Sequence, residues 1–235
     1  MENPIGKPLK KQFRMELAKL REMDFKAKAA YIWEYYKIHL IAICLIFVAI
    51  GSLLNHFVFN PPPSSALFIA WSSGFIQDEQ MNYLSSRLTE YIVDEDVNEI
   101  VEISMFATGG DPSMEMASVQ RLVAMIAAGT IDVFILDSQL LKEYSENGFI
   151  QPMDDILAEI RLTNPTAFNR IEEGITLVLY EYDEGYSSER IMGIDLSNSP
   201  LISELDVFAQ ELYFSIAVTS GKIENIPYAL MTLFE

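Results

Sequence analysis

A run of twenty residues without a charge constrains most strongly what this chain can fold into. Residues 40–59 read LIAICLIFVAIGSLLNHFVF and contain no Asp, Glu, Lys or Arg. A helix of this length rises about 30 Å, the thickness of the hydrocarbon core of a bilayer. The preceding segment YIWEYYK (31–37) supplies the aromatic and basic residues found at membrane–water boundaries. The run predicts a transmembrane helix. A buried core helix is the alternative, but such a helix seldom lacks a polar stripe over this length.

The charge is divided unequally on the two sides of this run. Residues 1–39 hold nine basic and five acidic residues, a net charge of +4, whereas residues 60–235 hold seven basic and 29 acidic residues, a net charge of −22. The positive-inside rule then places residues 1–39 in the cytoplasm and residues 60–235 outside the cell. A cleaved signal peptide is less favoured, because no cleavage site of small residues follows the apolar run. The sequence predicts a single-pass, signal-anchored protein of the cell membrane, with the lipid bilayer as the partner of residues 40–59.

Four regions follow from this division. Residues 1–39 form a basic, helical cytoplasmic segment, in which 8–23 is either an amphipathic helix on anionic lipid or only a topology-setting flank. Asp24 is placed to cap a new helix that leads into the transmembrane helix of residues 40–59. Residues 60–65, NPPPSS, are a stiff linker, because three prolines hold the backbone extended. Residues 66–235 are the extracytoplasmic domain.

The outer domain begins with strands and helices in alternation. Three apolar runs predict buried strands, at 66–71, 99–106 and 131–136. Helical patterns follow them at 78–92, from Asp111-Pro112 to Gly129, and from Asp137 or Ser138 to Gly148. Strands joined by helical crossovers lie parallel, with helices on both faces of the sheet. The predicted fold class is therefore α/β, with a mostly parallel sheet flanked by helices and preceded by a single transmembrane helix.

The rest of the domain is predicted to add three strands and two helices. A short helix at 153–161 ends before Asn164-Pro165. Strands at 175–182 and 190–197 suit a hairpin, because Asp183-Glu184-Gly185 between them is a turn signal. A strand at 211–220 and a helix at 223–234 complete the chain.

Ligands of parallel α/β sheets bind where the carboxyl ends of the strands meet the loops and helix N-termini. We therefore expect the candidate ligand-binding residues in the three loops that follow the first three strands. Amides of the glycines can hold an anion, and the tryptophan ring can stack on a sugar or another ring. Ordinary turn and helix-cap chemistry is the alternative at every position. The residues are Trp71, Ser72, Ser73, Gly109, Gly110, Asp111, Asp137 and Ser138.

Catalytic and metal-binding chemistry has little support in the sequence. Both histidines, His39 and His56, flank the apolar run, so residues 60–235 contain no His for a Ser-His-Asp relay. The single cysteine, Cys44, lies inside the run, and Asp94-Glu95-Asp96 lacks the spacing of a calcium-binding loop. The acidity also argues against a nucleic-acid partner. We expect no catalytic residues, no metal and no cofactor.

One stretch resembles a known family. Residues 129–157, GTIDVFILDSQLLKEYSENGFIQPMDDIL, are similar to a segment typical of bacterial extracellular solute-binding proteins, and GIDLSNSPL (193–201) resembles a later part of a lobe of that fold. The basic leader and single span resemble membrane-anchored proteins of low-GC Gram-positive bacteria. The resemblance implies a solute-binding-protein-like lobe. It departs from the family in length, since residues 66–235 suffice for one lobe rather than two.

Two functions follow as hypotheses. The first is a membrane-tethered binding domain that recognises a small solute or a surface partner without catalysis. The second is a structural accessory subunit of a membrane transporter or secretion assembly, held through its span and cytoplasmic helix. An enzyme is not expected.

Overall fold

The computed structural model describes residues 21, 23–106, 112–181, 187–205, 207 and 211–235. The chain divides into two compact units, Met1–Pro62 and Pro63–Glu235, called here the N-terminal unit and the C-terminal unit. Most of the predicted helix at 8–23 lies outside the described residues, as does the turn at 183–185.

The described part of the N-terminal unit is one long helix. Helix α2 spans Phe25–Leu54 and continues as a π-helical turn, η1, over Asn55–Phe59. The helix begins after Asp24 as predicted. The expected side-chain cap is wrong, however, because Asp24 contributes its carbonyl, which accepts from Lys28 N at 2.9 Å. By length and composition, Lys37–Phe59 is sufficient to cross a membrane. A helix of this kind serves as a membrane anchor or as a signal sequence.

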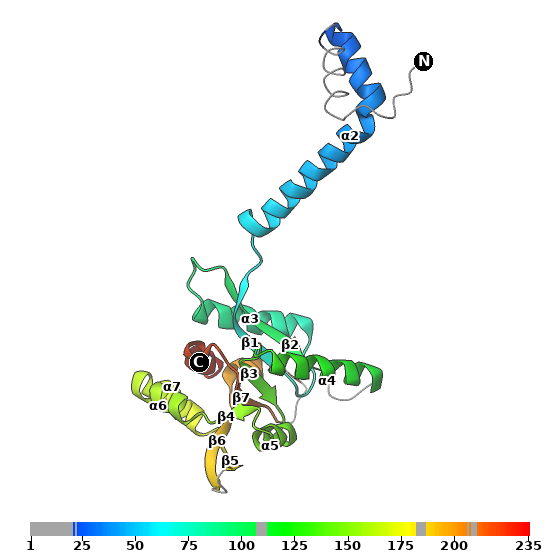
Figure 1. The fold of residues 1–235 in the computed structure, drawn as a ribbon. Helices are drawn as coiled ribbons and strands as arrows, with labels where there is room; N and C mark the ends of the chain where they lie inside the picture. Colours follow the sequence, from blue (N-terminus) through cyan, green and yellow to red (C-terminus); the bar gives the residue numbers. More distant parts are fainter. Residues whose placement is uncertain (1–20, 22, 107–111, 182–186, 206, 208–210) are drawn as a thin grey trace. The chain divides into compact units, whose positions relative to one another are not determined.

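The C-terminal unit is built on a mixed, seven-stranded sheet (Figure 1). Six strands lie in the order β2-β1-β3-β7-β6-β5, and β4 pairs with β7. The strands are β1 (Ser64–Trp71), β2 (Glu99–Met105), β3 (Val133–Leu136), β4 (Ile150–Gln151), β5 (Ile175–Glu181), β6 (Ser187–Asp195) and β7 (Tyr213–Ala217).

The α/β class is confirmed, but the expectation of a mostly parallel sheet is wrong. Only β1–β2 and β1–β3 are parallel pairs, as the strand–helix alternation predicted. Strand β7 joins β3 in antiparallel orientation, and β6, β5 and β4 extend the antiparallel half. The predicted hairpin of β5 and β6 is confirmed. Nothing local in the sequence shows that β7 is inserted between β3 and β6, since that pairing joins segments far apart in the chain.

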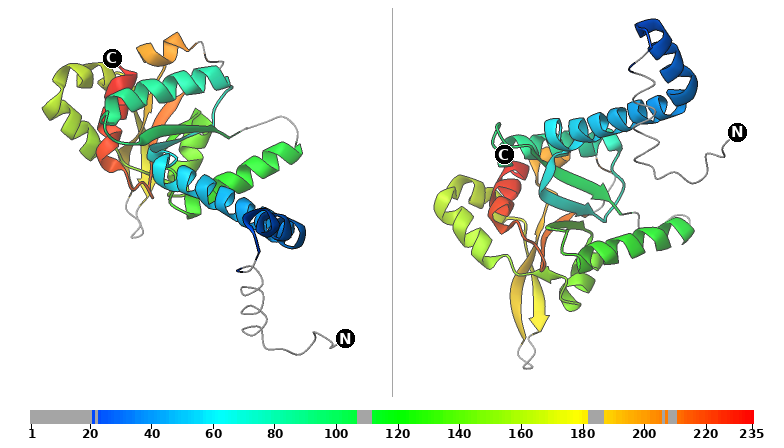
Figure 2. Two further views of the ribbon diagram at one scale, coloured as in Figure 1. Left: turned by 90° about the horizontal axis from the view of Figure 1, so that it is seen from above. Right: turned by 45° about the horizontal axis from the view of Figure 1, so that its top comes forward.

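Helices cover both faces of the sheet, giving three layers (Figure 2). On one face, α3, α6, α7, α8 and α9 pack against Leu67, Ile69 and Trp71 of β1. On the other face, α4 and α5 pack against Phe68 and Ala70. The side chains of β1 alternate between the two cores because successive residues of a strand point to opposite faces. The buried run 66–71 therefore serves both layers.

The helix boundaries follow local cap signals. Gly129 and Gly148 lie just beyond α4 and α5 with positive φ values of 65° and 68°, which glycine adopts without steric cost. Asp137 caps α5 by accepting a bond from Leu140 N at 2.8 Å. The helices are α3 (Asp78–Ile92), α4 (Pro112–Ala127), α5 (Ser138–Glu146), α6 (Asp154–Thr163), α7 (Pro165–Glu172), α8 (Pro200–Glu204), the 3₁₀ turn η2 (Ile223–Asn225) and α9 (Ile226–Leu233).

Candidate functional site

The predicted strand-end residues lie at the carboxyl ends of β1 and β3, which are neighbours in the sheet. Ser72 N donates to the carbonyl of Ile135 at 2.8 Å, so the two strand ends are joined directly. Ser73 Oγ donates to the carbonyl of Glu211 at 3.3 Å. Asp137 and the exposed Ser138 begin α5 at the same edge. Gly109, Gly110 and Asp111 lie outside the described residues.

Trp71 is not placed to stack on a ligand. Its side chain is fully buried in the core, and its Nε1 donates to the carbonyl of Ser73. The ring is enclosed because the apolar run of β1 continues through position 71, so strand alternation turns the side chain inward. Ser72 is also buried, and within the part of the chain that the structure describes its Oγ has no hydrogen-bond partner. The structure therefore places the Trp71 ring, predicted to stack on a ligand, inside the core rather than on the surface.

The same edge of the sheet carries negative charge. Tyr213, at the start of β7, lies here, and its partial burial raises the pKa of its phenol. The carboxylates of Glu211 and Asp195 raise that pKa further. Because charges of like sign repel one another, the carboxylates at this edge do not favour an anionic ligand.

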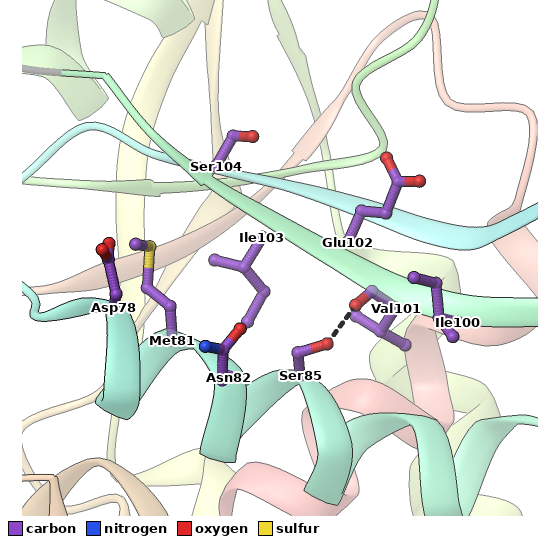
Figure 3. Close-up of a pocket in the computed structure, with 9 residues that line it drawn as sticks. All are labelled: Asp78, Met81, Asn82, Ser85, Ile100, Val101, Glu102, Ile103 and Ser104. Atoms are coloured by element: carbon purple, nitrogen blue, oxygen red, sulfur yellow. Dashed lines mark hydrogen bonds between the residues drawn. The ribbon is translucent and has the colours of Figure 1, made fainter. Parts of the chain in front are cut away.

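A groove of about 400 Å³ lies between α3 and β2 (Figure 3). Helix α3 contributes Asp78, Met81, Asn82 and Ser85 as one wall, and residues 100–104 of β2 form the other. The volume is in the range of sites that hold small ligands or short peptide segments. The nine lining residues include two acids, Asp78 and Glu102, and no Lys or Arg, so the lining itself is acidic. Arg121 of α4 adjoins it and donates to Ser104 Oγ at 3.3 Å.

Strand β2 is an edge strand, because β1 is its only sheet neighbour among the strands of the described residues. The backbone groups of successive strand residues point alternately to the two sides of the strand. Ser64 N donates to Asn98 O, and Phe106 N donates to Trp71 O, so residues with even numbers face β1. The odd-numbered residues of β2 consequently turn their N–H and C=O groups away from the sheet.

Helix α3 covers part of this edge. Ser85 Oγ donates to the carbonyl of Val101 at 2.5 Å, and Val101 N donates to Thr89 Oγ1 at 2.9 Å. The Thr89 hydroxyl in turn donates to the carbonyl of Ser85 at 2.7 Å. Two hydroxyls thus take the place of a neighbouring strand at Val101.

The hydrogen bonds from α3 to the backbone of β2 do not extend to Ile103, two residues beyond Val101. No hydrogen bond is found for the N–H or C=O of Ile103 among the residues that the structure describes, although its side chain packs against the core. Sequence reasoning identified β2 and α3 but not this groove. The missing information was the position of β2 at the sheet edge, which depends on where every other strand is placed.

A second hollow, of about 390 Å³, surrounds Asp132 at the amino end of β3. The buried carboxylate accepts bonds from Phe68 N at 2.9 Å, Ser220 Oγ at 2.8 Å and Gly221 N at 3.2 Å. These bonds connect β1, β3 and the loop after β7. Because its oxygens already accept three bonds, we assign Asp132 a structural role rather than a ligand-binding one.

Comparison with known proteins gives a partial likeness to a solved structure. No model of a protein family matches the chain, and no curated protein matches it. Among solved structures, an ABC substrate-binding protein from Listeria monocytogenes in complex with cycloalternan is similar, at 13% sequence identity and a TM-score of 0.34. The likeness covers 57% of this chain and 29% of that one, so this chain spans less than a third of its length. A likeness of this extent carries no argument about function.

Proposed function

We propose that this chain is a membrane-tethered extracytoplasmic binding domain that recognises a small solute or a surface partner in the groove between α3 and β2, without catalysis. In this proposal residues 40–59 span the membrane, residues 1–39 are cytoplasmic, residues 60–65 are the linker and residues 66–235 are the binding domain. The groove, with its acidic side chains and uncovered strand edge, is the observation that carries the proposal.

The surroundings of the groove suit recognition rather than chemistry. Residues 60–235 contain no His and no Cys, so the usual nucleophile–base pairs are missing from this part of the sequence. The wall and the edge offer an amide, hydroxyls and backbone groups, which orient a ligand by hydrogen bonds. The strand-end residues Ser72, Ser73, Asp137 and Ser138, with Gly109, Gly110 and Asp111, remain a second proposed contact surface.

A thermal-shift screen of the full chain in mild detergent tests this function. A ligand that binds the folded form raises the apparent melting temperature. Asn82→Trp, at an exposed position of the wall, fills the groove and should abolish the shift. The matched control Asn169→Trp, at an exposed position of α7, should retain it. A shift that survives in Asn82→Trp, or a broad screen that gives no shift, contradicts the proposed site.

One feature favours the accessory-subunit alternative. Helix α4 buries Leu122 but exposes three apolar side chains at helical spacing, Met116, Val119 and Val123. An exposed apolar stripe of this kind is typical of surfaces that contact another protein. If Val119→Lys with Val123→Lys releases the chain from a larger membrane complex while ligand shifts persist, the alternative is favoured.

A further inference from the structure

The uncovered edge of β2 points to the chemical class of the partner. We infer, resting on the proposed function above, that the groove binds an extended, lysine- or arginine-bearing segment of another protein, which adds as a strand beside Ile103. Strand addition to an exposed sheet edge is an established mode of peptide recognition, in which main-chain bonds supply affinity and side-chain pockets supply specificity.

The outward backbone groups of β2 favour the addition of a strand. A strand edge is a row of donors and acceptors that pairs with any suitable backbone, so proteins cover edges that have no partner. Here Ser85 and Thr89 cover the edge at Val101, whereas Ile103 turns its N–H and C=O outward into the groove. Among the residues that the structure describes, α3 therefore covers the edge at Val101 and leaves the outward backbone groups of Ile103 open to a partner strand.

The shape of the groove also favours the addition of a strand. Asp78, Met81 and Asn82 come from the first turns of α3 and stand across from Ile103 of β2, whereas Ser104 points away from α3 (Figure 3). The helix forms a lateral wall, so a strand entering beside β2 is contacted on its side chains as well as on its backbone. Asn82 offers an amide group to that strand, and Met81 offers an apolar contact.

Charge selects the class of occupant. Asp78 lies on the α3 side of the open edge and Glu102 points away from α3 (Figure 3), and neither appears in an ion pair among the residues that the structure describes. The guanidinium of Arg121 instead donates to Ser104 Oγ at 3.3 Å and lies over the Phe106 ring. Residues 60–235 carry a net charge of −22, so a second copy of this chain, or an acidic segment, is repelled. A segment with Lys or Arg is attracted, and opposite charges speed its encounter with the groove. The basic leader of this chain lies across the membrane in the proposed topology, which leaves a segment of a different protein.

Peptide binding to the full chain in phosphatidylcholine nanodiscs tests the inference. The probe is a labelled peptide of alternating Lys and Val, about six residues long to match a typical strand. Its control has the same sequence with N-methyl groups along one edge, which keep the charge but remove the main-chain donors. Each lost bond costs around 1 kcal/mol, so N-methylation should weaken binding at least about tenfold. A Glu/Val peptide should not bind.

Variants of the chain locate the contact. Ile103→Pro removes the outward N–H and leaves the bonds to β1 intact, since proline is tolerated where an edge N–H faces solvent. Binding should fall about fivefold, while Ile103→Val should bind like the wild type. Asp78→Asn with Glu102→Gln should weaken binding several-fold and reduce its salt dependence. The control Glu159→Gln with Glu172→Gln, at exposed positions of α6 and α7, should change neither the affinity nor its salt dependence.

The outcomes separate this inference from the proposed function. Equal binding of the N-methylated peptide overturns strand addition. If no peptide binds but a small solute shifts the melting temperature in an Asn82-dependent manner, this inference fails and the proposed function stands. If the chain self-associates and Ile103→Pro abolishes that self-association, the edge binds a second copy of this chain, and the inference is also overturned. If Ile103→Pro does not fold, the N-methylated peptide still decides the question on the wild-type chain.

Discussion

The long helix of the N-terminal unit and the sheet of the C-terminal unit use the same apolar side chains in opposite surroundings. Phe47 in α2 is 70% exposed, whereas Phe134 in β3 has no exposed surface. Throughout residues 41–59 the side chains face outward, while the two cores of the C-terminal unit enclose theirs. The comparison teaches that apolarity alone does not define a core, because the sheet encloses its apolar side chains whereas the N-terminal helix leaves its own exposed.

The largest expected effect comes from truncating one phenylalanine in each unit. Phe134→Ala removes a ring that packs edge-to-face on Tyr144 at 5.3 Å and should cost about 3–5 kcal/mol of unfolding free energy. In a domain of this size that loss lowers the melting temperature by roughly 10 °C. Phe47→Ala should leave it unchanged. Thermal unfolding of the full chain in detergent, followed by tryptophan fluorescence, measures both. Equal losses for the two variants break the comparison.

A second test places a charge on an exposed apolar position in each unit. Ile46→Arg puts a guanidinium in the middle of the proposed span and should oppose membrane insertion by about 3 kcal/mol. Leu162→Arg, at a side chain 84% exposed on α6, faces water and should leave insertion and stability unchanged. The measurement is the fraction of each protein that resists alkaline extraction from membranes. If Ile46→Arg remains fully inserted, the proposed anchor is contradicted.

The smallest expected effect is a pH dependence of the stability of the C-terminal unit. Burial raises the pKa of Tyr144 to about 12, and the carboxylates of Glu143 and Asp137 raise it as well. The unfolded phenol loses its proton near pH 10, while the folded one keeps it, so stability falls as the pH rises from about 10 to 12. The loss is of the order of 1–2 kcal/mol, discounted for residual contact with water.

Matched variants isolate this contribution. Tyr144→Phe should flatten the alkaline part of a denaturation–pH profile, whereas Tyr228→Phe, at an exposed ring of α9, should not. An unchanged slope in Tyr144→Phe would assign the alkaline loss to other groups.

Local signals account for the parts of the fold that sequence reasoning recovered. Helix α3 matches the predicted 78–92 because its apolar positions recur at helical spacing, and Gly129 and Gly148 mark real helix ends. Helix α7 was missed because Asn164-Pro165 was interpreted only as a stop. In the structure Asn164 caps that helix by accepting from Ala167 N at 3.0 Å, and Pro165 is its first residue. Ser199-Pro200 begins α8 in the same way.

Non-local features account for the rest. The insertion of β7 between β3 and β6 made the sheet mixed, and no pattern within β7 itself specifies its neighbours. The candidate groove depends on β2 being the outermost strand, which follows only from the complete strand order. Trp71 was predicted at a ligand site because it ends a strand, yet its ring lies in a core that is completed by residues of α6, α7, α8 and α9, far along the chain. Pairing and packing at a distance therefore limit what the sequence shows.

The place of β7 in the sheet also bears on how fast the domain forms. Val133 pairs with Ile216, so the central antiparallel ladder joins residues that are separated by most of the second half of the chain. Closing so long a loop costs entropy before its contacts stabilise anything, and folds dominated by such contacts form slowly. Until β7 arrives, β3 has an open edge facing away from β1. An open edge on an apolar strand is a template for pairing with another chain, so the contact of β7 with β3 also removes a site of aggregation.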